Sequence, residues 1–496
     1  MGIFREDREI RASRIIKLWV AEGFIKPKRA QMLEEIAEGY LNDLVDRNLV
    51  LVGRYRYNGK IRSCRLHDLI RDLCLKVSEK GRFFYAKRAL DNMSKERRFI
   101  CHDFIKSEDV HEMSDALMSA QLLRSLVCRG SKLPVVFKLL RVLTMASDCS
   151  AEDIIQNLNL RCLTFQPYFR ILVRLPSSIS FIWNLQTLSI HARLVVAPIE
   201  IWSLSQLRHV ECSRIYLPHP PPSPNDSVVM GNLQTLIKAV NLRLSEEVCK
   251  RIPNTNKLHL IYEDELEGYD DCLFDHLHNL GSLHELQSLK LVVSTFPNQS
   301  SCNADRLKCA FPVSLKKLLL AHCSLDWNDV TIIGSLPQLE ALELVYSVKG
   351  QRWSPVNGEF RRLRFLSIIK CDLRCWDADS SHFPVLKKLR LEGLKHLEAI
   401  PLDIGEIPTL EMISVVRCSE SAEISAMKIK EEEESLGNEG LQFQISSRKH
   451  IPKTHTAAKR DYEEHQMTSE TLRRWTEAAK MVIYKTLPGS TDYLPN

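Results

Sequence analysis

The sequence element with the clearest chemical potential is a histidine followed by an aspartate, His67 and Asp68, directly before an apolar run with helical spacing. An imidazole at the start of a helix can donate a hydrogen bond to an anion, and the helix dipole already favours negative charge at that end. Asp68 also fits the local role of a helix N-cap, because its carboxylate can accept from backbone N–H groups of the first turn. The pair therefore predicts an anion-binding helix start, with capping as the competing role of Asp68.

Other reactive residues form no recognisable catalytic or metal-binding pattern. Cys371-x-x-x-Cys375 and the Cys/His run at 272–278 each lack a second pair at zinc spacing. With 16 histidines, a Ser/His/Asp or Cys/His order means nothing without geometry. The Gly59-Lys60 pair belongs to no G-x-x-x-x-G-K-[ST] phosphate loop. The sequence thus predicts no enzymatic activity, no metal site, and no cofactor held by this chain alone.

A second candidate site consists of basic residues beside short leucine-rich strands in the C-terminal half. Side chains alternate on a strand, so the non-leucine positions of successive strands predict one shared face. A basic band with aromatic residues suits an acidic partner protein, and ordinary solvation of a strand edge is the competing interpretation. The predicted partner-binding residues are Lys316, Lys317, Glu340, Arg364, Phe365, Lys387, Lys388 and Arg390, with Tyr346 and Trp353 beside them.

These strands belong to a leucine ladder of the form L-x-x-L-x-L that runs through most of the chain. Its last five central anchors, at 318, 342, 366, 389 and 413, are spaced 24, 24, 23 and 24 residues apart. This is the leucine-rich-repeat period, in which each unit is one strand plus a return segment and units stack into a curved solenoid. Three cysteines lie five residues after an anchor, where a small buried polar side chain meets the turn backbone: Cys323, Cys371 and Cys418.

Residues 1–80 follow a different pattern. Apolar spacing predicts a helix at Ile10–Glu22 ended by Gly23, and a second helix after Pro27. The next two segments, 49–52 and 61–64, are joined through an Asn-Gly pair, the strongest short hairpin signal. A third helix is predicted at about 68–78. Helix, helix, hairpin, helix is the order of a winged-helix domain.

The domain organisation predicted from these patterns has four parts. A winged-helix domain at 1–80 is followed by a connecting helical segment at 81–120, which includes a short strand at Phe99-Ile100. The leucine-rich repeats occupy 121–420. The remainder, 421–496, is predicted to be a charged and poorly ordered tail, with the charge run at 428–434 as solvated helix or coil and one amphipathic helix at 469–484. The predicted fold class is α/β, a winged helix followed by a repeat horseshoe.

Bulk composition narrows the function class. A net charge of +6 over 496 residues is too mild to indicate nucleic-acid binding by itself. The N-terminus reaches charged residues after four positions, and no stretch of 18 uncharged apolar residues occurs. Fifteen scattered cysteines form no disulfide framework. These features predict a cytoplasmic protein without a transmembrane helix, and they leave peripheral membrane association open.

Three motifs in sequence order resemble plant nucleotide-binding leucine-rich-repeat (NLR) disease-resistance proteins of the coiled-coil class, closest to the nightshade late-blight-resistance group. Phe4-Arg-Glu-Asp-Arg-Glu-Ile10 leads into Leu18-Trp-Val-Ala-Glu-Gly-Phe24, similar to that family's winged-helix start. Leu66-His67-Asp68 is similar to the family's Met-His-Asp element, and the ladder follows where the family places it.

The resemblance implies an intracellular immune receptor that recognises a pathogen effector or a guarded host protein through its repeats. It implies autoinhibition, hypersensitive-response signalling in plant defence, and ADP or ATP as cofactor of the intact protein. By this resemblance His67, with Asp68, lies against the β-phosphate of ADP and holds the receptor off. The repeats are then also expected to contact the receptor's own or a paired nucleotide-binding domain.

The chain departs from the family in what precedes the winged helix. The family carries a coiled-coil domain and a nucleotide-binding core there, whereas this chain begins inside the winged helix and has Arg5 in place of the usual proline. It therefore resembles the C-terminal part of a receptor: a fragment, a truncated paralogue or an incomplete gene model. An ADP-linked switch is expected only where the missing core is present.

Two other functions fit parts of the sequence. A winged helix can place a helix in the DNA major groove, but the helix at 31–45 carries Glu34, Glu35, Glu38 and Asp43, which repel phosphates. A scaffold such as a ubiquitin-ligase substrate adaptor also joins a helical module to leucine-rich repeats. That alternative does not explain the Leu18–Phe24 run, and no specific nucleic-acid partner is expected.

Overall fold

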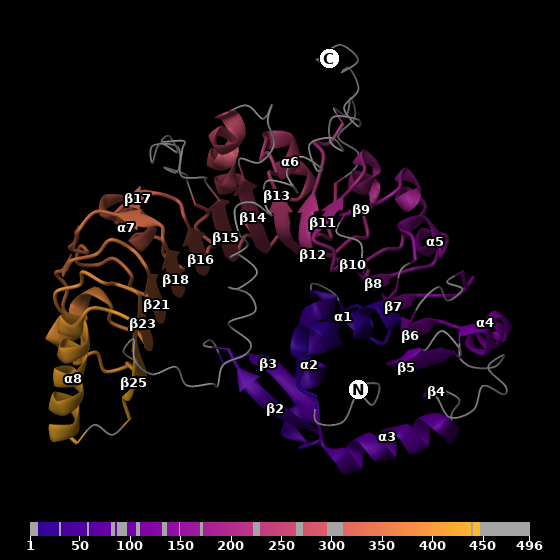
Figure 1. Cartoon of the computed structure of the whole chain (residues 1–496), viewed down its shortest axis with the longest axis horizontal. Helices are drawn as coiled ribbons and strands as arrows, with labels where there is room; N and C mark the ends of the chain where they lie inside the picture. Colours follow the sequence, from indigo (N-terminus) through magenta and orange to yellow (C-terminus); the bar gives the residue numbers. More distant parts are fainter. Residues whose placement is uncertain are drawn as a thin grey trace. The chain divides into compact units, whose positions relative to one another are not determined.

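The computed structural model describes residues 8–28, 31–56, 59–80, 85–86, 97–105, 110–130, 136–147, 149–168, 172–221, 229–263, 271–294, 311–437 and 440–446. The predicted helix at 469–484 lies outside these residues. The chain forms two compact units, one of Met1–Leu260 with Ser282–Leu289 and one of Ile261–Gly281 with Lys290–Asn496 (Figure 1). Among the helices described in them, none has the length and apolar composition needed to cross a membrane.

The N-terminal elements form the predicted winged helix. A three-stranded antiparallel sheet in the order β1-β3-β2 packs with the helices, and the strand β1 was not expected from the sequence. Its Ile10 pairs with Cys64, and both are buried in the small core. The elements are β1 (Ile10–Arg11), α1 (Ala12–Glu22), α2 (Leu33–Asp46), β2 (Val50–Tyr55), β3 (Ile61–Leu66) and α3 (Asp68–Lys80).

Helix α1 ends where the sequence predicts. Gly23 adopts a left-handed conformation with φ +80°, and its N–H donates to the carbonyl of Val20. A residue with a Cβ is strained in that conformation, so glycine is the natural terminator of the helix. The chain then turns into the segment that leads to α2.

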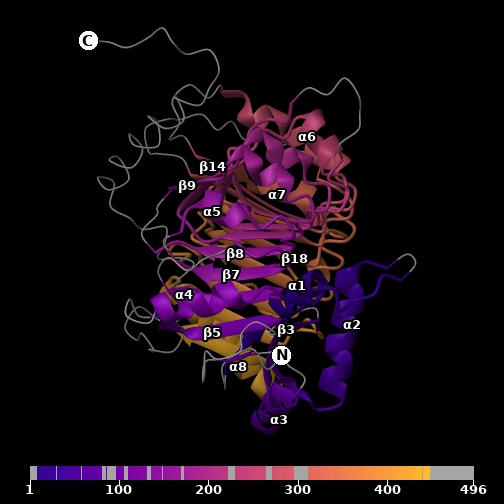
Figure 2. The same ribbon diagram turned by 90° about the vertical axis from the view of Figure 1, so that its right-hand side faces the viewer.

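In the first unit the repeats form a parallel sheet with helices or 3-10 turns as return segments (Figures 1 and 2). The strands are β4 (Tyr85–Ala86), β5 (Arg98–Ile105), β6 (Ser125–Gly130), β7 (Val142–Ala146), β8 (Cys162–Gln166), β9 (Leu172–Arg174), β10 (Thr187–Ile190), β11 (Leu194–Val196), β12 (His209–Tyr216) and β13 (Thr235–Val240). The return segments are α4 (Val110–Ser119), α5 (Ala151–Ile155), η2 (Ser177–Phe181), η3 (Ile199–Ser203) and α6 (Glu246–Arg251).

Three elements lie where the chain passes between the units: β14 (Lys257–Glu263), η4 (Asp271–Ser282) and β15 (Ser288–Ser294). The second unit repeats the same parallel pattern. Its elements are β16 (Lys317–Ala321), β17 (Leu325–Asp326), α7 (Trp327–Gly334), β18 (Ala341–Val345), β19 (Val348–Lys349), β20 (Arg352–Trp353), β21 (Phe365–Ile369), β22 (Cys375–Trp376), η6 (Ser380–His382), β23 (Lys388–Glu392), η7 (Leu402–Ile404), β24 (Met412–Val416), α8 (Glu420–Ser435) and β25 (Gln442–Ser446).

The regular spacing of the predicted anchors sets the register between neighbouring strands. Leu318, Leu342, Leu366, Leu389 and Ile413 are direct partners on neighbouring parallel strands, and all five are buried. Each anchor covers the apolar edge that a single repeat leaves open, which is why the units stack. The predicted fold class, a winged helix followed by leucine-rich repeats, is confirmed.

The predicted repeat limits of 121 and 420 are too narrow at both ends. At the start, β5 pairs in parallel with β6, and Phe99 is the partner of Leu126. The sequence pattern missed this repeat because Phe99 and Cys101 fill the buried positions that leucine fills elsewhere. The segment 81–120 therefore supplies a repeat strand as well as a helix.

At the other end, part of the predicted tail is a further repeat. Helix α8 buries Ala422, Ala426 and Ile429, and β25 pairs in parallel with β24. These positions are i, i+4 and i+7, and two of the three residues are alanine, so the buried stripe is narrow and was hidden by the charge run at 428–434. Of the two expected states of that charge run, helix or coil, the structure shows the helix.

The three cysteines predicted at the turn position meet backbone carbonyls there. The thiol of Cys323 donates to the Ala321 carbonyl at 3.4 Å, Cys371 to Ile369 at 3.6 Å, and Cys418 to Val416 at 3.6 Å. Burial raises the pKa of Cys371 and of Cys418 despite these contacts. Each thiol is a structural donor that closes its repeat.

Candidate functional site

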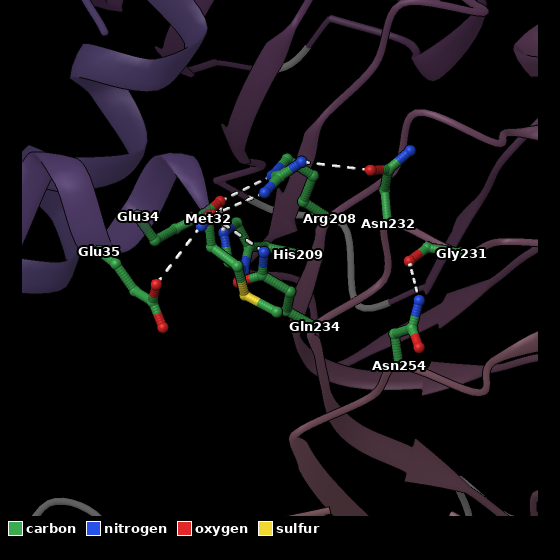
Figure 3. A network of polar contacts seen from close by, with 9 residues as sticks. All are labelled: Met32, Glu34, Glu35, Arg208, His209, Gly231, Asn232, Gln234 and Asn254. Atoms are coloured by element: carbon green, nitrogen blue, oxygen red, sulfur yellow. Dashed lines mark hydrogen bonds and ion pairs between the residues drawn. The ribbon is translucent and has the colours of Figure 1, made fainter. Parts of the chain in front are cut away.

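The winged helix and the repeat sheet of the first unit meet at a largely buried carboxylate, Glu34, in the first turn of α2. Arg208 binds it through two hydrogen bonds, from Nε to Oε1 and from Nη2 to Oε2, each of 2.7 Å. Gln234 Nε2 donates to Oε2 at 2.9 Å, and His209 Nε2 lies 3.2 Å from Oε1 (Figure 3). A forked arginine pair of this kind is strong and directional. Glu34 is thereby fixed to the repeats by three side chains.

The local sequence explains why Glu34 is the residue that reaches the sheet. The neighbouring carboxylate of Glu35 accepts from the backbone N–H of Met32 at 3.4 Å and so caps α2. On the other side, Asn232 Oδ1 accepts from Arg208 Nη1 at 3.3 Å and orients the guanidinium (Figure 3). Arg208 directly precedes β12 and Gln234 directly precedes β13, so the two donors lie at the same edge of neighbouring strands.

Burial alone would raise the pKa of Glu34, but the hydrogen bonds from Arg208 and His209 outweigh it and hold that pKa well below its usual range. Burial lowers the pKa of His209, and the bond to Glu34 opposes this only in part. The contact between them is therefore a hydrogen bond from a neutral imidazole, with the proton on Nε2. Within the described residues, Nδ1 of His209 has no hydrogen-bond partner, so a second proton there would have no acceptor.

A second carboxylate, Glu22 at the end of α1, is held in the same way. Arg98 donates to it from Nε at 3.0 Å and from Nη2 at 2.8 Å, and Ser125 Oγ also hydrogen-bonds to it. The Arg98 guanidinium lies 5.3 Å from the centre of the Phe24 ring, a cation–π contact. Glu22, Gly23 and Phe24 belong to the run that carried the family resemblance, and they all act at or beside this contact.

The winged helix covers one row of the sheet. Seven residues at the first position of successive strands are direct register partners and all are buried: Arg98, Ser125, Val142, Cys162, Thr187, His209 and Thr235. Three winged-helix residues cover this row. Glu22 contacts Arg98 and Ser125, Ala21 packs on Val142 and Cys162, and Glu34 contacts His209. Lys17 of α1 adds an ion pair with Glu211 of β12. Figure 2 shows α1 beside β7 and β8.

The equivalent row in the second unit consists of Lys317, Ala341, Phe365, Lys388, Met412 and Gln442. All of these except Ala341 keep solvent-accessible surface. This row therefore presents a mixture of basic and apolar side chains to solvent. The equivalent row of the first unit is buried under the winged helix.

The predicted partner-binding residues fall in this row and in two others. Lys317, Phe365 and Lys388 share the first-position row, whereas Arg390 lies two positions further along its strand, in the row of Glu343, whose pKa is raised by burial. Because side chains two positions apart on a strand share a face, Arg390 lies on the same face as Lys388, whereas the residues one position before each strand are out of step with that face. The remaining four each directly precede a strand, and after the first, the backbone N–H of each donates to the carbonyl of the preceding one in this order: Lys316, Glu340, Arg364 and Lys387.

The two aromatic residues expected beside the band have different environments. Tyr346 is exposed in a left-handed conformation with φ +50°, and its ring stacks on His322 at 4.9 Å. Lys370 Nζ lies 4.9 Å from the same ring. Trp353 is buried in the repeat interior between Trp327 and Trp376, so its expected place on the binding face is wrong.

His67 and Asp68 lie exposed at the start of α3. His67 has the capping role, because its Nδ1 accepts from the N–H of Leu69 at 3.3 Å and its carbonyl accepts from Arg71 at 2.9 Å. Asp68 is the first helical residue, so its expected N-cap position belongs to His67. With Nδ1 as acceptor, a neutral His67 carries its proton on Nε2, which leaves a donor for an anion.

Cys371 and Cys375 share no ligand. The first donates to backbone carbonyls, whereas Cys375 Sγ donates to Glu398 Oε2 at 3.2 Å. Across the residues that the structure describes, no three His, Cys, Asp or Glu side chains are grouped for a metal ion.

Sequence reasoning missed the contacts made by Glu22 and Glu34. Glu34 and Arg208 are 174 positions apart, and no local pattern relates them. The acidic character of α2 was a visible signal, but it indicated only that this helix avoids phosphates. The basic residues beside the strands were visible too, and their partner became evident only in the fold.

Acidification is expected to loosen this contact. In the docked state the depressed pKa of His209 keeps the ring neutral, whereas a released ring protonates below its ordinary value of 6.5. The undocked state then binds more protons, so docking is strongest above pH 6.5 and weakens as the pH falls. Glu34 acts in the same direction below its ordinary value of 4.5, since its docked pKa is also depressed.

The measurement is amide hydrogen exchange of residues 12–46, corrected for intrinsic rates, at about pH 7.5 and about pH 5.5. Protection should fall at the lower pH. In His209→Gln the amide can still donate to Glu34 but does not titrate, so much of the pH dependence should disappear. An unchanged dependence in that variant would refute the role of His209.

Two sequence families match this chain. One is described as the disease resistance protein winged helix domain and matches residues 3–74. The other is described as a leucine-rich repeat region and matches residues 122–440.

Related proteins come from Solanum demissum. One putative late blight resistance protein homolog is 30% identical over 472 residues, which cover 87% of this chain and 34% of that protein. Late blight resistance protein R1-A is 29% identical over 470 residues, which cover 87% of this chain and 35% of that protein. Another putative homolog is 29% identical over 481 residues, covering 90% and 59%. The chain thus spans about a third of the length of the first two.

Among solved structures, the Leptospira interrogans LRR protein LIC12759 is similar with a TM-score of 0.42 and 16% identity, over 72% of this chain and 99% of that one. The functional domain of InlJ from Listeria monocytogenes is similar with a TM-score of 0.37 and 15% identity, over 65% of this chain and 69% of that one.

Proposed function

The chain belongs to the plant NLR disease-resistance proteins, with their winged-helix domain and leucine-rich repeat region, and from this premise we propose that it is the sensor and autoinhibitory segment of an immune receptor. The relatives are named for resistance to late blight. The proposed role is binding and regulation, with no catalytic step in this segment. The proposed site of action is the cytoplasm. Neither the DNA-binding nor the scaffold alternative gains support from these relatives.

The observation that carries the proposal is the fixation of Glu34 by Arg208, His209 and Gln234. A contact of this kind holds the winged helix on the repeat sheet at rest. A ligand that favours the released state shifts the equilibrium by its difference in affinity for the two states. The repeats can therefore control the winged helix without any chemistry of their own.

The proposed recognition surface is the first-position row of the second unit with Arg390 beside it. Lys317, Phe365 and Lys388 offer cations around an aromatic side chain. Such a surface suits an acidic pathogen effector or guarded host protein, with Phe365 as the apolar anchor. Lys316, Glu340, Arg364 and Lys387 border this row and supply a polar rim.

His67 is proposed to contact ADP in a receptor that also carries the nucleotide-binding core. Its exposed place at the start of α3 and its outward Nε2 proton suit a phosphate oxygen. Asp68, beside it in the first turn, is the family's companion residue. Through this contact the winged helix would join the receptor's own or a paired nucleotide-binding domain to the repeats.

The test is expression of the intact receptor in leaves with Arg208→Glu. Two carboxylates would then face each other, so hypersensitive cell death is expected without any pathogen. The exchange variant Glu34→Arg with Arg208→Glu restores an opposite-charge pair and is expected to reduce the response. Arg352→Glu is the matched control, because Arg352 makes an equally short but exposed contact to Asp377. A silent Arg208→Glu receptor that accumulates normally would contradict the proposal.

A further inference from the structure

Five residues at the ends of strands in the second unit share a rare backbone conformation. Each directly follows the last residue of β16, β18, β21, β23 or β24, and each is left-handed. The φ angle is +58° at His322, +50° at Tyr346, +51° at Lys370, +70° at Gly393 and +55° at Arg417. We call these five residues the left-handed row. Only glycine adopts this conformation without strain, so four of the five side chains are present at an energetic cost.

The repeat geometry explains the conformation but not the side chains. The backbone N–H of each residue in the row donates to the carbonyl of the residue that ends the next strand, at distances between 2.7 and 2.9 Å. These bonds place the five residues on successive parallel strands, which lie about 4.8 Å apart. Glycine, as at position 393, satisfies the same turn without strain. The imidazole, phenol, ammonium and guanidinium groups of the other four therefore need a reason beyond the turn itself.

The side chains of the left-handed row contact one another along the sheet edge. The ring of Tyr346 stacks on His322, with ring centres 4.9 Å apart and an angle of 13° between the planes. Lys370 Nζ lies 4.9 Å from the centre of the same ring, a cation–π contact. Gly393 leaves the space that Lys370 needs, because a Cβ at position 393 would lie 2.6 Å from Lys370 Cγ. The aromatic and cationic groups are thereby held in place before any partner arrives.

The left-handed row is accessible and lies beside an aliphatic row. His322 and Arg417 are exposed, and Tyr346 keeps 41% of its surface. The last residues of the same strands are direct register partners, and Val345 and Val416 among them keep accessible surface. The full aliphatic row is Ala321, Val345, Ile369 and Val416, interrupted by Glu392, which pairs with Arg390 at 2.6 Å. The edge thus combines cations and a phenol with adjoining apolar surface.

We propose that the left-handed row and the aliphatic row together bind an acidic peptide segment of a partner protein, which lies in extended form across the strand ends. Carboxylates of the peptide pair with Lys370 and Arg417, and apolar side chains between those carboxylates contact Val345 and Val416. An extended segment of about seven residues spans about 20 Å, which matches five strands spaced about 4.8 Å apart. This goes beyond the proposed recognition surface, which lies at the other end of the same strands and uses none of these residues.

A peptide suits this edge better than a nucleic acid does. Single-stranded nucleic acid binds by stacking its bases on the faces of aromatic side chains. Both faces of the Tyr346 ring are occupied, because His322 and Lys370 approach it from the strands on either side. A peptide needs only the exposed ring edge, the hydroxyl and the neighbouring cations. The aliphatic row beside them also favours apolar side chains over a sugar-phosphate backbone.

The test is calorimetric titration of the full chain with a synthetic peptide of about seven residues that alternates glutamate with leucine and has blocked ends. The salt concentration is about 150 mM, which screens weak surface attraction. Saturable binding is expected, and Lys370→Gln with Arg417→Gln should weaken it by at least about tenfold through the loss of two charge-assisted contacts. The matched control is Lys317→Gln with Lys388→Gln, which removes the same charge from the other end of the strands and should leave the affinity unchanged. A peptide with serine in place of leucine should bind more weakly.

Arg417→Gly separates binding from folding, because glycine relieves the left-handed backbone while it removes the cation. Peptide affinity should fall in this variant, and the melting temperature of the chain should not. A lower melting temperature with unchanged affinity would assign Arg417 a structural role and overturn the proposal. So would the absence of saturable binding, an equal loss in the two double variants, or tighter binding of a single-stranded DNA oligonucleotide with the same sensitivity to Lys370 and Arg417. These results leave the restraint by Arg208 untouched, so the receptor proposal is tested separately.

Discussion

Replacing Arg208 by alanine is expected to weaken the docking of the winged helix on the repeats by about 3–5 kcal/mol, because a buried carboxylate loses its cation. Glu34 and Arg208 are only 16% and 12% exposed, so water replaces the guanidinium poorly. His209 and Gln234 remain as neutral donors and limit the loss. By the relation of 1.36 kcal/mol to each tenfold step, exchange through undocking should accelerate by about 10²–10⁴-fold.

The measurement is native-state hydrogen exchange of residues 12–46, which reports local opening separately from global unfolding. Arg352→Ala is the control, since Arg352 also donates to a carboxylate, Asp377, at 2.7 Å but is 73% exposed. Exposed pairs contribute about 0–1 kcal/mol, so this control should leave the exchange unchanged. Equal effects of the two substitutions would show that burial does not govern the Glu34 contact.

The repeat fold was predictable because its information is local and periodic. Leu318, Leu342, Leu366 and their partners recur at a fixed spacing, and the register of the strands follows from that spacing alone. The prediction missed those repeats in which residues other than leucine fill the buried positions. Phe99 replaces a leucine, and Ala422 and Ala426 form a buried stripe too small to stand out from the charges around it.

The candidate site was less predictable because its partners are distant in sequence. Three glutamates of α2 are alike in sequence yet have three different roles. Glu35 caps its own helix, Glu38 pairs with Lys60 at 2.8 Å, and Glu34 binds the repeats. Only the packing of α2 on the sheet distinguishes them. His67 shows the opposite case, since its place at a helix start followed from local sequence, while its contact with nucleotide stays a prediction.

Trp353→Ala is expected to destabilise the second unit by about 3–5 kcal/mol, the range for removal of a fully buried aromatic side chain. The ring is 1% exposed. It stacks on Trp327 at 4.8 Å and on Trp376 at 5.5 Å, and it meets the edges of Phe360 and Phe383. These five rings come from successive return segments, so the loss should spread to several repeats.

The measurement is hydrogen exchange of β18, β21 and β23, with Trp183→Ala as the control. Trp183 is 64% exposed, so its removal should leave those strands unchanged. A comparable effect of the two substitutions would contradict the assignment of Trp353 to the repeat interior.

Trp353→Phe separates packing from hydrogen bonding at the same position. Within the described residues, the indole N–H groups of Trp353 and Trp376 have no hydrogen-bond partner. A buried donor without an acceptor costs about 1–3 kcal/mol, and phenylalanine removes that donor while keeping an aromatic ring in the stack. The phenylalanine variant should therefore retain most of the stability that alanine loses. If the two variants are equally destabilised, an acceptor for the indole must exist in solution, and the stack is held by a polar contact as well as by its rings.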